Sequence, residues 1–157
     1  MSIEVIFTRR RSVAEEIERL IQAAETSVDA ALYRLNNPRL ARILVEAAAR
    51  GLRVRLVLDH GKYDETQITR ELMSKADLTF RLLPGRLGRG SKMHHKFAIL
   101  DDATLLTGSY NWTVESEKEN FDNLLVIRDS EEIQPYRQEF EALWKDADES
   151  QKAEIKR

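Results

Sequence analysis

The sequence has no cysteine, little glycine and proline, and no long apolar run. Without cysteine the chain forms no disulfide, thiolate nucleophile or cysteine metal site. Six glycines and three prolines in 157 residues exclude a fibrous or low-complexity chain. No apolar run approaches the ~18 residues of a membrane-spanning helix, and the opening residues MSIEVIFTRRRS place the arginines after the apolar run, the reverse of a secretory signal. We therefore expect a soluble, cytoplasmic protein without stable membrane association.

The chain also lacks an excess of charge of either sign. It has 25 lysines and arginines against 27 aspartates and glutamates, for a formal net charge of -2. This balance gives no overall attraction to nucleic acid or to an anionic membrane, so contact with a polyanion must come from local basic clusters. The composition is typical of a folded chain, and the length suits one domain. We predict a domain over residues 1–145 and a charged tail over residues 146–157, either a helical extension or disordered.

The apolar pattern alternates between strands and helices. Short runs rich in β-branched residues predict strands at Ile3–Phe7, Ser27–Tyr33, Leu52–Asp59 and Leu78–Leu83. Helical spacing and cap residues predict helices between them, at 13–24, 38–50 and 64–75. The second half of the chain predicts two strands joined at Asp101-Asp102, a strand at Asn123–Asp129 and a helix at Glu131–Trp144. This order predicts an α/β fold, with a mixed central sheet and helices on both faces.

Two of the three histidines are adjacent, in the stretch KMHHKFAILDDATLLTGSYNWT. Side chains alternate between the faces of a strand, so His94 and Lys96 are predicted to point the same way. His95 is predicted to point to the opposite layer, where it packs or forms a hydrogen bond. The two histidines are therefore expected to have different roles, with His94 as a nucleophile beside the cation of Lys96.

A glycine, a hydroxyl and an amide follow in the same stretch, at Gly108, Ser109 and Asn111. The glycine permits a close approach of the backbone to a ligand, and the other two side chains offer hydrogen bonds. Together with His94 and Lys96 they supply a nitrogen nucleophile and several donors for the oxygens of a phosphoryl group. The stretch therefore predicts a site for phosphoryl chemistry.

The spacing of these residues resembles the His-Lys-Asp signature of the phospholipase D superfamily. Four residues separate Lys96 from Asp101, and six more separate Asp101 from Gly108. The segments SVDAALYRLNNPRLARILVEAAARGLRVRLVLD and ENFDNLLVI are similar to the flanks of that motif, so the resemblance covers nearly the whole chain. Because the chain carries one copy of the motif, it resembles the branch of small bacterial endonucleases and mitochondrial cardiolipin hydrolases, which complete the site by homodimerisation.

The resemblance implies an α-β-α sandwich and a reaction through a covalent phosphohistidine at His94. His94 of a second copy then acts as acid and base, while Lys96, Ser109 and Asn111 hold the phosphoryl oxygens without a metal or other cofactor. Asp122 stands where the family usually has glutamate, and the resemblance implies that it orients the ring of His94. Asp101 completes the signature, although a place at a strand end also fits a role in the turn.

The loop PGRLGRGSK precedes the histidine pair and carries Arg86, Arg89 and Lys92. It does not match the nucleotide-binding phosphate loop, because lysine and serine stand in the reverse order. We predict that its cations contact flanking phosphates of a polymeric substrate, with a mobile surface loop as the alternative. The run Arg9–Arg11 is a weaker candidate of the same kind, His60 is predicted to lie at the surface, and Trp112 is predicted to lie in the core.

These observations favour a metal-independent phosphodiesterase that cleaves DNA or RNA as a homodimer. A phospholipase D or cardiolipin hydrolase is the first alternative, because the same chemistry cleaves phospholipid diesters. A nucleic-acid-binding module without activity is the second alternative, and retention of His94, Lys96, Ser109 and Asn111 argues against it.

Overall fold

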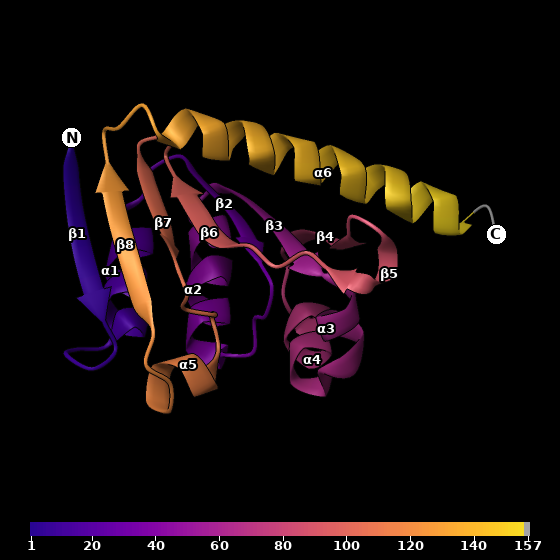
Figure 1. The fold of residues 1–157 in the computed structure, drawn as a ribbon, viewed down its shortest axis with the longest axis horizontal. Coiled ribbons are helices and arrows are strands. Elements are labelled where there is room, and N and C mark those ends of the chain that lie inside the picture. The colour runs from indigo at the N-terminus through magenta and orange to yellow at the C-terminus, as the bar shows by residue number, and fades with distance from the viewer. Residues whose placement is uncertain (156–157) are drawn as a thin grey trace.

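A mixed sheet organises the part of the chain that the computed structural model describes, residues 1–155 (Figure 1). Its eight strands follow the order β1-β8-β7-β6-β2-β3-β4-β5. The strands are β1 (Ser2–Phe7), β2 (Ser27–Leu32), β3 (Arg53–Asp59), β4 (Thr79–Gly85), β5 (Gly88–Lys92), β6 (Lys96–Leu100), β7 (Thr104–Gly108) and β8 (Asn123–Arg128). The helices are α1 (Val13–Ala23), α2 (Pro38–Ala49), α3 (His60–Glu65), α4 (Gln67–Lys75), α5 (Val114–Lys118) and α6 (Ile133–Ile155).

The directions of the strands bring the ends that carry the predicted site residues to one edge of the sheet. Strands β2, β3 and β4 are parallel, and the remaining neighbours pair antiparallel. The carboxyl ends of β2, β3, β7 and β1 therefore lie at the same edge as the amino ends of β6 and β8. Ligands of open α/β sheets bind beyond the carboxyl ends of the parallel strands, which is this edge.

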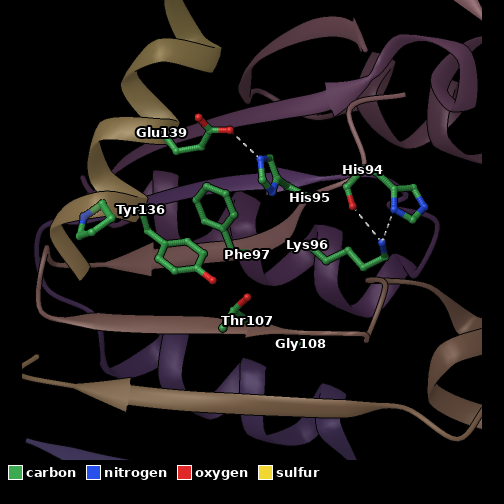
Figure 2. A pocket seen from close by; sticks show the side chains of 9 residues that line it. His94, His95, Lys96, Phe97, Thr107, Gly108, Tyr136 and Glu139 are labelled. Carbon is green, nitrogen blue, oxygen red and sulfur yellow. Dashed lines mark hydrogen bonds and ion pairs between the residues drawn. The ribbon is translucent and has the colours of Figure 1, made fainter. Parts of the chain in front are cut away.

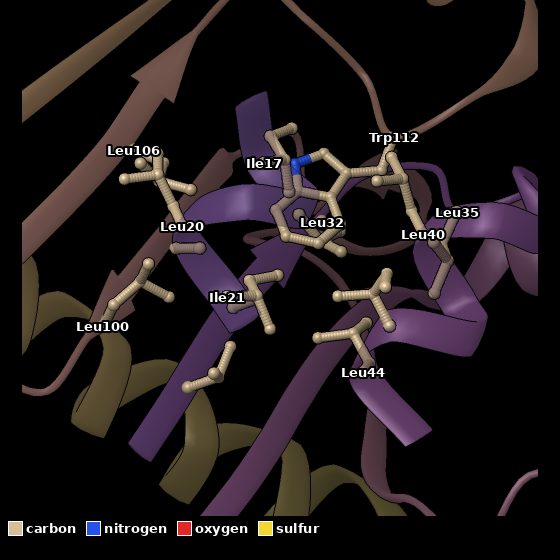
Figure 3. Close-up of a cluster of buried hydrophobic side chains, with 14 of the residues drawn as sticks. Ile17, Leu20, Ile21, Leu32, Leu35, Leu40, Leu44, Leu100, Leu106 and Trp112 are labelled. Carbon is tan, nitrogen blue, oxygen red and sulfur yellow. The ribbon is translucent and has the colours of Figure 1, made fainter. Parts of the chain in front are cut away.

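Helices α1 and α2 cover one face of the sheet. The Ser12 hydroxyl accepts a hydrogen bond from the backbone N–H of Glu15 at 3.0 Å, and the Asn37 side chain accepts one from the N–H of Arg39 at 3.0 Å. These caps begin α1 and α2 where the sequence predicted them. The apolar cluster beneath the helices includes Ile17, Ile21, Leu40, Leu44 and Trp112 (Figure 3). Trp112 is a core residue, as predicted.

Helix α6 crosses the opposite face of the sheet (Figure 1). Phe97 of β6 and Phe140 of α6 are buried in the second apolar cluster. The buried carboxylate of Asp29 also joins the layers, because it accepts hydrogen bonds from Arg55 of β3 and Arg137 of α6. Burial acts to raise the pKa of Asp29, but the bonds to the two arginines outweigh it and hold that pKa below its usual value. Helices on both faces confirm the predicted fold class.

Helix α6 continues beyond its predicted end at Trp144, through residues 146–155. Ala147 is fully buried, so a part of the predicted tail packs against the second cluster. The helical extension is thus the alternative that is found. Residues 156 and 157 of the predicted tail lie outside the described residues. None of the helices described here combines the length and the apolar character needed to cross a bilayer.

Three further elements differ from the sequence prediction. The helix predicted at 64–75 is divided, because Thr66 adopts an extended conformation that ends α3 and begins α4. The basic loop forms a hairpin of β4 and β5, with Gly88 at a positive φ of 80° in its turn. Helix α5 was not predicted, and its cap is Thr113, whose hydroxyl accepts a hydrogen bond from the N–H of Ser116 at 3.1 Å.

Candidate active site

The predicted nucleophile and its neighbours lie at the edge of the sheet where β6 begins and β7 ends. The antiparallel register pairs Phe97 with Thr107, which sets Lys96 beside Gly108. His94 lies just outside β6, and Ser109 just outside β7. A cavity of about 370 Å³ opens here between the strands and α6 (Figure 2). Its walls are formed by His94, His95, Lys96, Phe97, Thr107, Gly108, Pro135, Tyr136 and Glu139.

The side chains of His94 and Lys96 are in contact, as their predicted common face requires. Lys96 Nζ lies 3.3 Å from His94 Nδ1 and donates a hydrogen bond to the carbonyl oxygen of His94 at 2.9 Å. The ring of Tyr33, the residue after β2, packs against the imidazole with 4.4 Å between the ring centroids. Lys96 Nζ also lies 5.4 Å from the centroid of Tyr33. The imidazole is therefore held between an aromatic ring and an ammonium group.

The surroundings of His94 favour its neutral form. Partial burial lowers the pKa of His94 below its ordinary value, and the positive charges of Lys96 and Lys92 lower it further. The carboxylate of Asp59 acts on this pKa in the opposite direction. Burial also lowers the pKa of Lys96, opposed by the charge of Asp122. A neutral imidazole has a free electron pair, which is what a nucleophile at phosphorus requires.

Ser109 and Asp122 form a hydrogen-bonded pair at the same edge. The Ser109 hydroxyl donates to Asp122 Oδ1 at 2.8 Å and accepts from the N–H of Asn123 at 3.0 Å. Asp122 Oδ2 is buried and has no partner among the described residues. The implied bond between Asp122 and the ring of His94 is not formed; the carboxylate holds Ser109 instead. Aspartate is one methylene shorter than the usual glutamate, which fits this change of partner.

Asn111 lies beside α5, and Gly108 lies against β8. The N–H of Asn111 donates to the hydroxyl of Ser116 at 3.2 Å, and its side-chain oxygen is buried without a partner in the described chain. None of the described contacts joins Asn111 to His94. A Cβ on Gly108 would lie 2.3 Å from the carbonyl oxygen of Asn123. The close approach of β8 therefore requires this glycine, independently of any ligand.

Asp101 does not join the cluster. It follows β6 at the end opposite to Lys96, with a positive φ of 56°. Its carboxylate accepts hydrogen bonds from the backbone N–H groups of Glu25, Thr26 and Ser27, at 2.7 to 3.1 Å. The expectation of a catalytic role is thus corrected to the turn role that the sequence left open, because these bonds fasten the β6–β7 turn to the start of β2.

The basic hairpin lies beside the nucleophile. Arg86 and Lys92 line a groove of about 700 Å³ that also includes His94 and the side chains of Leu143 and Asp146 on α6. Arg89, the third predicted cation, is exposed on β5 and is not among the lining residues. Two of the three predicted substrate contacts are thus close to His94, and they lie on a hairpin rather than on an irregular loop.

Asp59 and Tyr33 belong to the site but were not selected from the sequence. The buried carboxylate of Asp59 accepts the N–H of Met93 at 2.9 Å and the N–H of Lys62 at 2.9 Å. It thereby fixes both the start of α3 and the residue before His94. Both follow or end strands at the edge where the parallel strands finish, a position that could have indicated them.

His95 has the separate role that strand alternation predicted. Its Nε2 lies 2.7 Å from the carboxylate of Glu139 on α6, and its ring contacts Phe97 edge to face at 5.3 Å. Figure 2 shows this pair directed toward α6, while Lys96 reaches toward His94. The adjacent histidines therefore face different partners. His60, predicted at the surface, is the first residue of α3, and its side chain is only 14% exposed.

An imidazole, an ammonium and a hydroxyl therefore lie at one edge of a mixed sheet, and phosphoryl transfer uses groups of these kinds. The family model described as "Cardiolipin synthase, PLD-like domain" matches residues 17–144, and the chain belongs to the phospholipase D superfamily. The mitochondrial cardiolipin hydrolase of Mus musculus is 36% identical over 132 residues, which are 83% of this chain and 57% of the relative. The phospholipase D of Rickettsia conorii is 28% identical, over 87% of this chain and 66% of the relative.

This chain spans between half and two thirds of the length of these curated relatives. Two solved structures share the fold over most of both chains. Nuc from Salmonella typhimurium, a phospholipase D family member, has a TM-score of 0.82 at 23% identity and covers 92% of this chain and 95% of its own. NucT from Helicobacter pylori has a TM-score of 0.80 at 23% identity, with 92% and 98% covered. At this identity the two structures establish the fold alone.

Proposed function

We propose that the chain is a metal-independent phosphodiesterase that hydrolyses nucleic acid through a covalent phosphohistidine at His94. The observation that carries the proposal is the contact of His94 Nδ1 with Lys96 Nζ, 3.3 Å apart on the wall of a cavity. Burial and the ammonium charge lower the pKa of the imidazole, which favours the neutral form that attacks phosphorus. The ammonium also supplies the positive charge that stabilises phosphoryl oxygens.

In the first step a ring nitrogen of His94 attacks phosphorus, and the bond from phosphorus to the leaving oxygen breaks. Lys96 Nζ donates hydrogen bonds to the non-bridging oxygens, which gain negative charge in the transition state. The hydroxyl of Ser109 adds a second donor when it releases Asp122 Oδ1 and turns its single proton toward the phosphoryl group. The leaving oxygen takes a proton from an acid on its far side. The products of this step are the released alcohol and a phosphohistidine.

In the second step a base removes a proton from water, the water oxygen attacks phosphorus, and the bond from phosphorus to His94 breaks. One group serves as acid first and base second, which suits an imidazole with an unperturbed pKa of ~6.5. We propose that this group is His94 of a second copy. The neighbouring imidazole of the same copy, His95, is a poorer choice, because its Nε2 already contacts the carboxylate of Glu139 on α6.

Nucleic acid is the proposed substrate because cationic side chains extend away from the nucleophile along the surface. Arg86 and Lys92 line the groove that begins at His94, and Arg9 and Arg10 line a depression beyond Asp122. Cations on both sides of the reacting phosphate suit a polymer with a phosphate in every unit. A single small diester would use only the central cavity.

A phospholipid diester is the second candidate. The observation in its favour is the sequence identity of 36% to relatives named mitochondrial cardiolipin hydrolase. The groove beside His94 also has apolar walls at Leu83 and Leu143, which suit an acyl or glycerol group. The same nucleophile and the same cations would act on either substrate.

Cleavage in excess EDTA tests the proposal. End-labelled single- and double-stranded DNA and RNA, and vesicles that contain cardiolipin, are incubated with the wild type and with His94→Ala. We expect EDTA-resistant cleavage of nucleic acid that is absent in the variant. Cleavage of cardiolipin alone would move the assignment to the second candidate, and binding of nucleic acid without turnover would indicate a module without activity.

The composite site has a test of its own. Wild type and His94→Ala are unfolded together, refolded in equal amounts and assayed at constant total protein. If each site needs His94 from both copies, activity falls to roughly one quarter, because random pairing leaves only that share of dimers intact. A fall to one half, or a monomer by light scattering at micromolar concentration, would contradict the shared site.

A further inference from the structure

A second depression, of about 480 Å³, lies beside the candidate active site where β1 ends. Its walls are formed by Phe7, Thr8, Arg9, Arg10, Phe121, Asp122 and Asn123. Asp122 belongs to both places, because its carboxylate holds Ser109 at 2.8 Å. The depression is therefore linked through Asp122 to Ser109, a residue of the candidate active site. Its volume falls within the ~300–1,000 Å³ range of small-ligand sites.

Two aromatic rings face solvent in this depression. Phe121 is 80% exposed and Phe7 is 51% exposed, although phenylalanine is among the residues most often buried in folded chains. Both rings line the depression, and no contact between them is formed in the described structure. Arg9 Cζ lies 4.5 Å from the centroid of Phe121, over the face of the ring. The depression thus offers aromatic faces with a guanidinium already stacked on one of them.

Hydrogen bonds hold the two chain segments that carry these rings together. The N–H of Thr8 donates to the carbonyl oxygen of Asp122 at 3.0 Å, and the N–H of Asp122 donates to the hydroxyl of Thr8 at 2.9 Å. The same hydroxyl donates to the carbonyl oxygen of Asn120 at 2.7 Å. Because Thr8 follows Phe7, and Phe121 lies between Asn120 and Asp122, these bonds fix the backbone on both sides of the depression.

The three arginines of the run Arg9–Arg11, next to the depression, differ in whether they form ion pairs. Arg11 is bound by Glu4 at 2.5 Å and by Glu16 at 3.3 Å. Arg9 and Arg10 form no ion pair with any residue of the described chain. Their positive charges are thus available to an anion, and they lie on the same surface as the exposed rings. This combination matches the groove of aromatic platforms and cations that binds single strands.

We infer that Phe7, Phe121 and Arg9 form a base-stacking subsite for single-stranded nucleic acid next to the scissile phosphate. The inference rests on the proposed function and narrows its substrate to a strand with an unpaired base at this position. A base stacks on an exposed aromatic face, and a flanking phosphate pairs with the arginines. A second copy of the chain is the competing occupant, and the measurement of the oligomeric state given below distinguishes the two.

Binding of designed oligonucleotides tests the subsite. In a His94→Ala background, fluorescence anisotropy measures the Kd of a single strand with all its bases and of the same strand with abasic positions. We expect Phe121→Ala to weaken binding of the complete strand about tenfold, the size of a lost stacking contact, and to leave the abasic strand unaffected. Ile68→Ala, at an apolar residue of α4 that is 53% exposed, is the matched control and should change neither Kd.

The arginine has a separate readout. Arg9→Gln should lower the slope of log Kd against log salt concentration by about 1, because one phosphate contact is lost. Phe121→Ala should leave that slope unchanged.

The subsite is overturned if Phe121→Ala and Ile68→Ala bind the complete strand equally while the wild type still binds and cleaves it. It is overturned in favour of a contact between copies if Phe121→Ala converts a sedimenting dimer into a monomer. If the wild type neither binds nor cleaves nucleic acid, the proposed function and the subsite fail together. A last assay compares turnover of an abasic strand by the wild type and by Phe121→Ala, both with His94 intact. Equal turnover shows that Phe121→Ala affects stacking and leaves the chemistry intact.

Discussion

The neighbouring histidines His94 and His95 are of the same residue type and lie at the same end of β6, but they have opposite environments. His94 faces an ammonium and an aromatic ring, and burial with neighbouring positive charge lowers its pKa. His95 faces the carboxylate of Glu139. One position in the chain separates them, and although both line the same cavity, each imidazole has a different partner. Because the two residues are of the same type, the difference comes from the partner: an ammonium beside His94 and a carboxylate beside His95.

Replacing each histidine in turn gives the largest expected contrast. His94→Ala should lower kcat/KM at least about a thousandfold, the scale for loss of a covalent nucleophile. His95→Ala should keep activity within a few-fold, because it loses only a partly exposed pair with Glu139. Initial rates on an end-labelled strand measure both, with circular dichroism as the control for folding. Equal losses in the two variants would contradict the division of roles.

Removing the ammonium beside His94 has the next largest expected effect. Lys96→Met keeps the length of the side chain and removes its charge, so we expect kcat to fall about a hundredfold through lost stabilisation of phosphoryl oxygens. The acid limb of the pH profile should also move to higher pH, because Lys96 lowers the pKa of His94. A full pH profile of kcat/KM measures both effects. An unchanged acid limb would place the titrating group elsewhere.

Two more distant charges should move the acid limb of kcat/KM in opposite directions. Attack requires neutral His94, so the limb follows its pKa. Lys92 lowers that pKa, and Lys92→Gln should therefore move the limb to higher pH. Asp59 raises it, and Asp59→Asn should move the limb to lower pH. Shifts in the same direction would contradict this electrostatic account. Asparagine keeps an oxygen for the N–H of Met93, which limits structural disturbance.

The smallest expected effect is that of replacing Glu139, the partner of His95. Glu139→Gln removes the charge of a pair in which both side chains are nearly half exposed. The free energy of unfolding should change by no more than about 1 kcal/mol. Denaturant titration measures this change, and the acid limb of kcat/KM should stay where it is. A displaced limb would mean that Glu139 acts on the nucleophile after all.

Much of this arrangement could be predicted from local pattern. The caps at Ser12 and Asn37, the strand alternation around Lys96 and the mixed sheet follow from residues close together in the chain. The common face of His94 and Lys96 was also predicted from their spacing of two, and the extended chain keeps it although His94 lies just before β6.

Contacts between distant segments could not be predicted in the same way. Asp101 is used by backbone N–H groups at the start of β2, and Asp122 by the hydroxyl of Ser109. In both cases a short carboxylate binds the donor that folding brings within reach. The length of α6 is a similar case, since burial of Ala147 depends on the second cluster and its flanking residues are highly charged. Asp59 was passed over because its partner, the N–H of Met93, is remote in sequence.

The two hydrogen bonds between Thr8 and Asp122 have a practical consequence for anyone who handles this protein. They tie the end of the first strand, an edge strand of the sheet, to the backbone of the residue whose carboxylate holds Ser109. A fusion or a truncation that disturbs the end of β1 would therefore loosen the residue that holds Ser109. Loss of turnover in a tagged preparation would then report a disturbed strand, and removal of the tag should restore turnover.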